Sequence, residues 1–337
     1  IEAIGGILEL VVINAQPFQL PAVEGKSLAT DQEKYFRELA ELMSVDDRPS
    51  ISVIIPVYNG AKTIAQTVEC LLRQSLKPAE IIVVDDGSTD ETLEILRSFD
   101  GQITILNQPN SGPASARNRG VRTAKGDFTA FTDSDCLPDK DWLFNLALGF
   151  DNERVAGVGG AVRSAVQGLT GEYVDAIRLL DPQPDESGEI PYLITANACF
   201  RREVLMEAGL FNERFRKPGG EEPDVCLRIR NLGYEFRFAE QALVRHHHRQ
   251  TVSSFLKTIA NYGEGLYVLS RLWPDYRIEN PLRRWLKRLI ELRSIIRRIP
   301  KYAARYGLFK AVYFSLLDYL RQIAYLSGYL RGRRREA

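Results

Sequence analysis

Two pairs of acidic residues stand where they could do chemistry. Asp133-Ser134-Asp135 follows the apolar run Phe128–Thr132, and Asp85-Asp86 ends a second apolar run that begins at Ile81. Two carboxylates one residue apart, at the carboxyl end of a buried strand, suit a hard divalent cation that also holds a phosphate. The alternative is an acidic turn that caps the next helix. The order of the surrounding elements favours the cation site.

Short apolar runs alternate with segments of helical periodicity from Ser50 onward. The runs predict strands at 51–57, 81–84, 103–106 and 128–132. The segments between them predict helices at about 64–72, 91–99 and 114–124. This alternation predicts a mainly parallel α/β sheet, whose ligands bind beyond the carboxyl ends of the strands. Both acidic pairs lie at such ends.

The alternation becomes looser after Asp135. There the pattern predicts strands at 155–162, 193–200, 235–238 and 242–244. It predicts helices at 201–208, 222–232 and 252–272, the last ended by Trp273-Pro274. Residues 1–49 are the least regular part, with one strand predicted at 7–13 and one helix at 31–43. We therefore treat 1–49 as an N-terminal extension of unclear fold.

The charge distribution is uneven although the formal net charge of the 337 residues is zero. Residues 271–337 carry about 17 lysines and arginines against about 5 acidic residues. Such an asymmetry predicts a basic appendage that meets an anionic partner, either nucleic acid or a membrane surface.

The cysteines indicate a reducing compartment. They show no Cys-x-x-Cys spacing, which argues against a zinc site or a disulfide framework. They are Cys70, Cys136, Cys199 and Cys226. No apolar stretch has the length of a membrane span, and no signal peptide is visible. Since the chain begins with Ile1 rather than Met, we expect a processed or truncated product.

A set of ordered motifs extends from residue 50 to about residue 270. They are Pro56-Val57-Tyr58-Asn59, Val83-Val84-Asp85-Asp86-Gly87-Ser88-Thr89-Asp90, Gly112-Pro113-Ala114-Ser115-Ala116-Arg117-Asn118, Asp133-Ser134-Asp135, Ala196-Asn197-Ala198, Glu221-Glu222-Pro223-Asp224 and His246. Their order resembles that of family 2 glycosyltransferases. The resemblance implies an α/β fold of the GT-A type over residues 50–270, with a Rossmann-like, mainly parallel central sheet that binds nucleotide sugars. Residues 271–337 then form a basic amphipathic helical extension.

The resemblance implies a divalent cation, Mn²⁺ or Mg²⁺, at the Asp-x-Asp motif. Asp135 is expected to be the direct ligand, and Asp133 to act through the ribose or through water. His246 is expected to complete the site, and an imidazole ligand favours manganese. The alternative for His246-His247-His248 is a solvated surface cluster.

The resemblance also implies the nucleotide-sugar contacts. They are expected at Pro56, Tyr58, Asn59, Asp86, Gly112, Arg117, Asp133 and Asn197. Asp86 is expected to accept a hydrogen bond from the base, whereas Asp85 could instead cap the following helix. Arg117 is placed to meet a phosphate or the Asp-x-Asp carboxylates, unless it is a surface charge on its helix.

The catalytic base is expected in the acidic stretch before the helix 222–232. The family's Glu-Asp-x-Asp pattern aligns with this stretch and places the base at Glu222. Here Glu replaces Asp, which lengthens the reach by one methylene, and Pro223 follows, as suits the first turn of a helix. This departure leaves Glu221 a rival. The non-catalytic alternative is that both acids merely favour the helix N-terminus.

These features predict an inverting, metal-assisted glycosyltransferase with a glutamate general base. The expected donor is a nucleoside diphosphate sugar, most readily a UDP-sugar, and the expected acceptor is a saccharide or a lipid-linked sugar. The first strand is not followed by the glycine-rich loop of a nucleotidyltransferase or a dehydrogenase. A phosphoacceptor signalling domain would not explain the Asp-x-Asp motif. A GT-A domain without turnover, acting as a nucleotide-sugar-binding partner subunit, remains the alternative.

The basic C-terminal region predicts peripheral contact with an anionic membrane. Its clusters alternate with apolar and aromatic residues, at Arg283-Arg284, Lys287-Arg288, Arg297-Arg298 and Arg333-Arg334-Arg335. The expected location is therefore cytoplasmic, at the inner face of the plasma membrane. A packed helical tail is the alternative, and nucleic-acid binding is not expected because a glycosyltransferase gives it no purpose.

Overall fold

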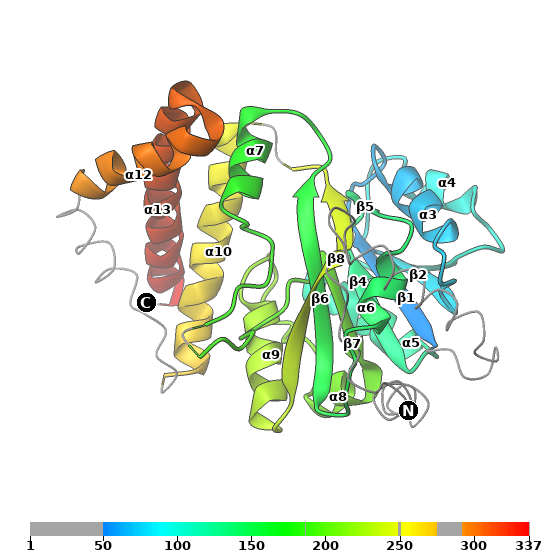
Figure 1. The fold of residues 1–337 in the computed structure, drawn as a ribbon. Helices are drawn as coiled ribbons and strands as arrows, with labels where there is room; N and C mark the ends of the chain where they lie inside the picture. The colour runs from blue at the N-terminus through cyan, green and yellow to red at the C-terminus, as the bar shows by residue number, and fades with distance from the viewer. Residues whose placement is uncertain (1–49, 186, 249–250, 275–291, 337) are drawn as a thin grey trace, which may run out of the picture.

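The chain folds around one mixed eight-stranded sheet with helices on both faces (Figure 1). The computed structural model describes residues 50–185, 187–248, 251–274 and 292–336. The strand and the helix expected in residues 1–49 lie outside the described residues. The strand order is β3-β2-β1-β4-β7-β6-β8-β5. This mixed α/β sheet confirms the predicted fold class.

One half of the sheet is parallel and holds the four strands with the clearest apolar runs. They are β1 (Ile51–Val57), β2 (Glu80–Asp85), β3 (Thr104–Asn107) and β4 (Phe128–Thr132). The prediction for these strands is confirmed, with small shifts at their ends. Alternate residues of β1 face opposite layers, since Val53 and Ile55 join one core cluster and Ile54 joins the other. Because β2 and β4 both run parallel to β1, the acidic pairs at their carboxyl ends lie at the same edge of the sheet, where these strands end.

The second half of the sheet is mixed and departs from the prediction in detail. Its strands are β5 (Cys136–Pro138), β6 (Val155–Ser164), β7 (Asn197–Arg201) and β8 (Glu235–His246). The two short strands expected at 235–238 and 242–244 form the single strand β8, with an irregularity opposite Gly160 and Ala161. The unexpected strand β5 pairs Cys136 with His246, and this pairing brings the end of β8 to the Asp-x-Asp motif.

Helices cover each face of the sheet. One face carries α3 (Ile64–Leu72), α4 (Thr92–Arg97) and α6 (Trp142–Ala147). The other carries α5 (Pro113–Thr123), α8 (Arg202–Glu207) and α9 (Glu221–Asn231). Helix α6 was not expected. Each helix turns its apolar residues to the sheet, so the strands are buried on both sides.

A separate group of helices stands beside the sheet. It consists of α7 (Leu169–Ala176), α10 (Val252–Leu272), α12 (Leu292–Tyr306) and α13 (Leu308–Glu336). Helix α13 runs along α10 (Figure 1), and the group shares an apolar cluster around Tyr173 and Phe314. The basic C-terminal region is thus helical where it is described, while its segment 275–291 lies outside the described residues. No helix in the described ranges is both long and apolar enough to cross a membrane.

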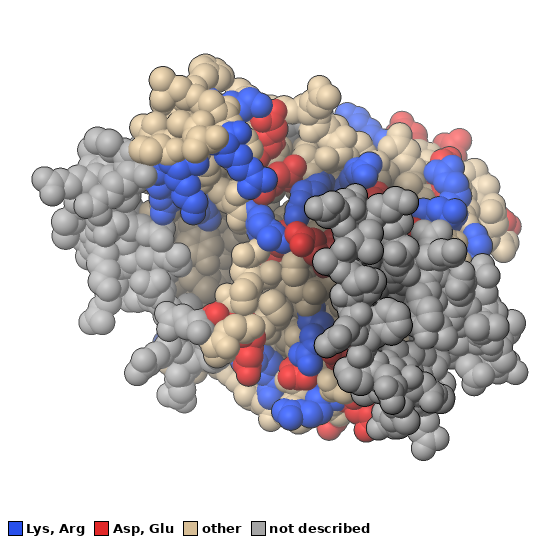
Figure 2. All heavy atoms as spheres, viewed as in Figure 1, with Lys and Arg blue, Asp and Glu red and all other residues tan. Residues whose placement is uncertain are grey.

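A cavity of about 380 Å³ lies between this helical group and the sheet. Basic and acidic side chains share its lining: Arg163, Glu172, Asp175, Arg178, Glu240 and Arg305. Blue and red atoms lie side by side at this junction in Figure 2. The cavity is therefore close to neutral and does not provide the basic surface that the sequence predicts.

Candidate active site

The Asp-x-Asp motif and the end of β8 together form a cluster of potential metal ligands. One ligand atom from each of Asp133, Asp135, Cys136 and His246 lies within 4.8 Å of the others. His246 Nε2 is 3.3 Å from Asp135 Oδ1. The backbone N–H of His247 donates to the Asp135 carbonyl at 2.9 Å, which ties the two segments together. The oxygen and imidazole donors of this cluster fit a divalent cation of the Mn²⁺ or Mg²⁺ class.

Cys136 is the member of the cluster that fits such a cation least. Its side chain is fully buried. Burial, together with the nearby charges of Asp133 and Asp135, raises the pKa of the thiol well above its ordinary value. A thiol that keeps its proton is a poor ligand. The ligand set that fits is therefore Asp133, Asp135 and His246, the set expected from the sequence.

His246 and His248 form a mostly buried pair and not a solvated cluster. His246 Nδ1 and His248 Nδ1 are 2.9 Å apart, within hydrogen-bond distance. His248 Nε2 lies 3.6 Å from Asp175 Oδ1 on α7. Because the contact with His248 uses Nδ1, the Nε2 atom of His246 faces Asp135. The alternative of a solvated cluster is wrong for His246 and His248, whose side chains are 16% and 6% exposed.

Arg117 connects the Asp-x-Asp motif to the acidic helix start. Its guanidinium is 3.4 Å from Asp133 Oδ1 and 3.1 Å from Glu221 Oε1, and its side chain is 5% exposed. Burial by itself would lower the pKa of Arg117, but the carboxylates of Asp133, Glu221 and Glu222 raise it. The arginine therefore stays charged, and the alternative of a surface charge is wrong.

The two candidate bases have different surroundings. Glu221 is buried, pairs with Arg117 and accepts the backbone N–H of Gly219 at 2.7 Å. Glu222 is half-buried, and Thr195 donates both its N–H and its hydroxyl to Oε1, at 2.8 and 2.6 Å. Burial and the charge of Glu221 raise the pKa of Glu222, while Arg117 and Thr195 act in the opposite direction. A carboxylate that binds a proton more readily is the better general base.

The charge of this carboxylate reaches two tyrosines, Tyr192 and Tyr262, neither of which the sequence pattern indicated. Tyr262 comes from α10, and burial followed by the charges of Glu222, Asp133 and Glu221 raises its pKa. Tyr192, which is 39% exposed, also lies within range of the charge of Glu222. Helix α10 thus contributes to the site, although its sequence reads as an ordinary amphipathic helix. The sequence carries no signal that distinguishes Tyr262 from the other aromatic residues of this helix, so its role is visible only in the folded structure.

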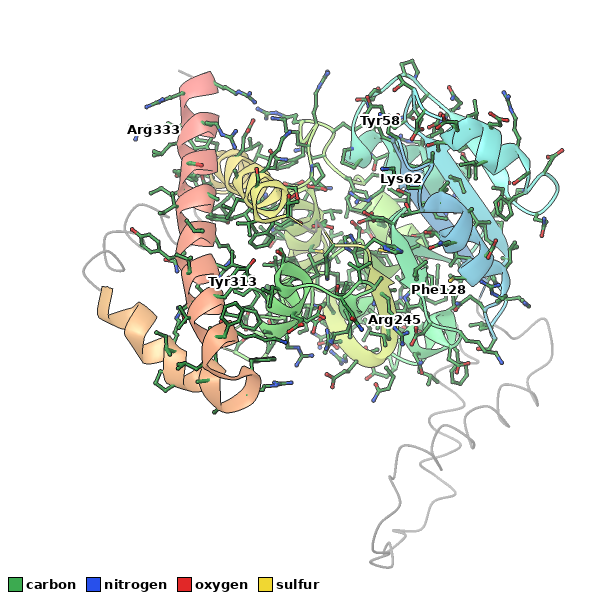
Figure 3. All side chains as sticks on the ribbon, turned by 90° about the horizontal axis from the view of Figure 1, so that it is seen from above. Tyr58, Lys62, Phe128, Arg245, Tyr313 and Arg333 are labelled. Carbon is green, nitrogen blue, oxygen red and sulfur yellow. The ribbon has the colours of Figure 1, made fainter. Side chains whose placement is uncertain are left out.

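The loops after β1 and β2 are bonded to each other. Asn59 has a left-handed backbone with φ 53°, and its Oδ1 accepts the backbone N–H of Thr89 at 2.8 Å. Its own N–H donates to Ser88 Oγ. Tyr58 is 52% exposed at the edge of these loops and lies across the molecule from α13 (Figure 3). Pro56, paired with Val84 inside β1, leads into this loop pair.

The acids Asp85 and Asp86 organise neighbouring loops. Asp86 accepts hydrogen bonds from Gln108 Nε2, Ser111 N and Gly112 N, at 2.8, 2.9 and 2.8 Å. Gly112 has φ 94°, and a Cβ there would collide with the backbone of Arg216. Asp85 accepts the Ser88 N–H inside a turn and does not cap α4, which begins four residues later at Thr92. The bond from Asp86 to a base stays a prediction.

The expectation for Asn197 needs correction. Its side chain is 1% exposed. Its Nδ2 donates to the carbonyls of Ala161 and Ala242, and its Oδ1 accepts from Trp142 Nε1. The amide therefore joins strands β6, β7 and β8 to α6 and has no polar atom turned to the site. A buried amide of this kind has the same sequence pattern as a ligand-binding one.

Comparison with known proteins identifies the family. Residues 52–209 match the description "Glycosyl transferase family 2", and residues 131–330 match "Glycosyl transferase family group 2". The chain is a family 2 glycosyltransferase. This glycosyltransferase is 33% identical over 236 residues to the pre-mycofactocin glycosyltransferase of Mycobacterium tuberculosis, a match that covers 67% of this chain and 48% of the relative. It thus spans about half the length of that protein.

Two further comparisons agree with this assignment. The glycosyltransferase is 32% identical to the amylovoran biosynthesis glycosyltransferase AmsB of Erwinia amylovora, over 59% of this chain and 69% of that one. Its fold is similar to that of the mannosyltransferase PcManGT from Pyrobaculum calidifontis, which was solved with GDP-Man and Mn²⁺. That similarity has a TM-score of 0.57 at 18% identity and covers 100% of this chain and 99% of the other. The GT-A fold is therefore confirmed.

Proposed function

We propose that this protein is a metal-assisted, inverting glycosyltransferase that uses a nucleoside diphosphate sugar. The supporting observation is the bridge made by Arg117. It contacts Asp133 of the potential metal site at 3.4 Å and Glu221, the neighbour of Glu222, at 3.1 Å. The groups suited to the leaving diphosphate and the group suited to the attacking hydroxyl thus belong to one ion-pair network. This arrangement supports an active enzyme over an inactive binding subunit.

The residues that would hold the cation are Asp135, His246 and Asp133. A bound divalent ion would stabilise the charge that develops on the leaving diphosphate. Arg117 keeps a positive charge beside Asp133 throughout and can meet a phosphate oxygen. The similar fold of PcManGT, solved with GDP-Man and Mn²⁺, supports manganese as the ion.

Glu222 is proposed as the base. Both hydrogen bonds from Thr195 go to Oε1, so Oε2 is the atom that would accept the proton of the acceptor hydroxyl. The attacking oxygen then forms a bond to C1 on the face opposite the departing diphosphate, and the configuration inverts. Glu221 is fixed by Arg117 and by Gly219 N. Its role is to place Arg117 and to raise the proton affinity of Glu222.

The proposed donor is a UDP-sugar, and ligand-induced stabilisation tests it. Folded protein that binds a ligand at about 100 times its dissociation constant gains about 2.7 kcal/mol. We expect a UDP-sugar with Mn²⁺ to raise the melting temperature, and GDP- or dTDP-sugars to raise it less. The control is each nucleotide sugar with chelator. No rise with any nucleotide sugar would contradict the proposed function.

The pH profile of transfer should report Glu222. Burial raises the pKa of this carboxyl to about 7, and the base must be ionised to act, so kcat/KM should fall as the pH drops through this value. Thr195→Val removes the hydroxyl donor that favours the ionised form, and should move the acid limb to higher pH. Thr129→Val is a matched control, because the Thr129 hydroxyl has no hydrogen-bond partner in the described chain. An acid limb that Thr195→Val does not move would contradict the assignment.

The proposed acceptor is a saccharide or a lipid-linked sugar. The charge of Glu222 reaches Tyr192 and Tyr262, and aromatic rings in this region would suit the apolar face of a sugar. A lipid-linked acceptor would require a place at the inner face of the plasma membrane. The C-terminal helices α12 and α13 would provide the membrane contact that such an acceptor requires.

A further inference from the structure

Helix α13 carries an apolar face that is largely exposed in the described part of the chain. The residues of this outer face recur at intervals of three, four and seven, so they line one side of the helix. They are Phe309, Val312, Leu316 and Ile323, with Leu308 beside them, and are 40% to 75% exposed. From Phe309 to Ile323 the face is about 21 Å long, at 1.5 Å per residue. A solvated helix normally presents charged residues on this side.

The opposite side of α13 is fully occupied. Phe314 and Leu317 are buried in the cluster shared with α7 and α10. Asp318, also buried, accepts hydrogen bonds from Tyr173 and Tyr302 and pairs with Arg298 and Arg321. The inner side of α13 therefore makes the apolar and polar contacts that hold this helix against α7, α10 and α12. Arg298, one of the basic residues expected to face a membrane, instead pairs with the buried Asp318. The apolar residues of the outer face are the ones exposed to solvent.

The ends of the outer face are basic. Arg331, Arg333 and Arg334 are exposed at the C-terminal end, and Lys301 is exposed near the other end, on α12. Figure 3 labels Arg333 at one end of α13 and Tyr313 nearer the other. Among the described side chains of α12 and α13 the acid present is Asp318, which is buried. The outer face thus combines an apolar centre with positive ends.

Charge decides between the occupants that an apolar face can have. A second copy packed antiparallel would place the arginines at one end against Lys301 at the other. A parallel copy would place Arg333 and Arg334 against themselves. Like charges would meet in both arrangements, at a cost for the dimer. An anionic lipid surface matches the apolar centre and the basic ends together.

We propose that the outer face of α13 docks on the interface of an anionic bilayer. The helix lies flat, with Phe309, Val312 and Leu316 in the boundary between head groups and acyl chains. The exposed arginines contact anionic head groups at its end. This docking does not depend on glycosyl transfer, so its test is independent of the proposed function.

Flotation of the full chain with vesicles tests the docking. We expect it to float with vesicles of phosphatidylcholine plus phosphatidylglycerol, and poorly with phosphatidylcholine alone. Leu316→Glu should lower the partition coefficient at least tenfold, because a charge replaces a side chain in the apolar layer. Arg333→Gln with Arg334→Gln should lower it about 30-fold, at about fivefold per charge near the surface.

The control is Met206→Glu, which places the same charge on an apolar residue of α8 that is 42% exposed. Both glutamate variants are at exposed positions, and equal melting temperatures will establish that they fold. Equal flotation of Leu316→Glu and Met206→Glu would overturn the proposal, as would equal binding to neutral and anionic vesicles. A dimer in solution that Leu316→Glu dissociates would assign the face to a second copy instead.

Discussion

Asp135→Ala is expected to lower glycosyl transfer at least about a hundredfold. Its carboxylate belongs to the cluster of potential metal ligands that includes Asp133 and His246, and groups that stabilise charge mainly in the transition state have effects of this size. Initial rates at saturating donor, over a series of Mn²⁺ concentrations, measure the loss. Mn²⁺ binding, followed by electron paramagnetic resonance, should weaken in parallel. That second measurement separates a lost ligand from a misplaced substrate.

Asp139→Ala is the matched control for this variant. Asp139 follows β5, a few residues beyond the motif, and its side chain pairs with the exposed Arg245 at 3.3 Å. An exposed pair of this kind contributes little to stability, so the control should retain both activity and Mn²⁺ affinity. Near-normal transfer by Asp135→Ala, or full activity of the wild type in excess chelator, would refute the role of the cation.

Glu222→Gln is expected to abolish transfer while donor binding is retained. The amide keeps the shape and the acceptor atom that Thr195 contacts, but it cannot take up the acceptor proton. The stability of the variant provides a second measurement. The folded wild type has a pKa of about 7 at this carboxyl against an ordinary value of 4.5. It therefore binds more protons than the unfolded chain in this window, and its stability falls as the pH rises from about 4.5 to 7.

The glutamine variant should lack this part of the pH dependence, so above pH 7 its melting temperature should equal or exceed that of the wild type. Glu221→Gln makes the informative comparison, because it weakens a buried ion pair with Arg117. It should therefore melt at lower temperature and keep part of its activity per folded molecule. If Glu221→Gln is inactive and Glu222→Gln is active, the roles are exchanged. Normal turnover by both variants would place the base elsewhere.

The fold was predictable where local pattern and burial coincide. The short apolar runs of β1, β2 and β4, which alternate with helical segments, are typical of strands buried on both faces. The pairing of β5 with β8 was not predictable, because three residues, Cys136–Pro138, carry no periodicity. Their partner lies more than a hundred residues away in the sequence. The continuity of β8 was also hidden, since its middle is interrupted by the exposed Glu240 and Gln241.

The site was predictable to the extent that its motifs carry charge. The approach of His246 to Asp135, and of Arg117 to Asp133, agrees with the ligand and ion-pair groups expected from residue type. Asn197 was misplaced because an amide that joins strands looks like one that binds a ligand. Tyr262 was missed because one face of α10 meets the candidate site while the other meets α13. Only the three-dimensional arrangement shows which residue faces which.

Gly263 and Gly265 place the backbone of α10 in close contact with neighbouring backbone on two sides of the helix. A Cβ at Gly265 would overlap the carbonyl of Gly219, in the loop that leads to Glu221, and a Cβ at Gly263 would overlap the carbonyl of Tyr325 on α13. Both contacts therefore join backbone to backbone. No side chain lies between the segments that could change its rotamer and absorb a displacement. A sideways shift of α13 would be passed to the loop before the proposed base as a rigid movement. Through α10, helix α13 thus supports the loop that precedes the proposed base, and a chain shortened before α13 would lack this support.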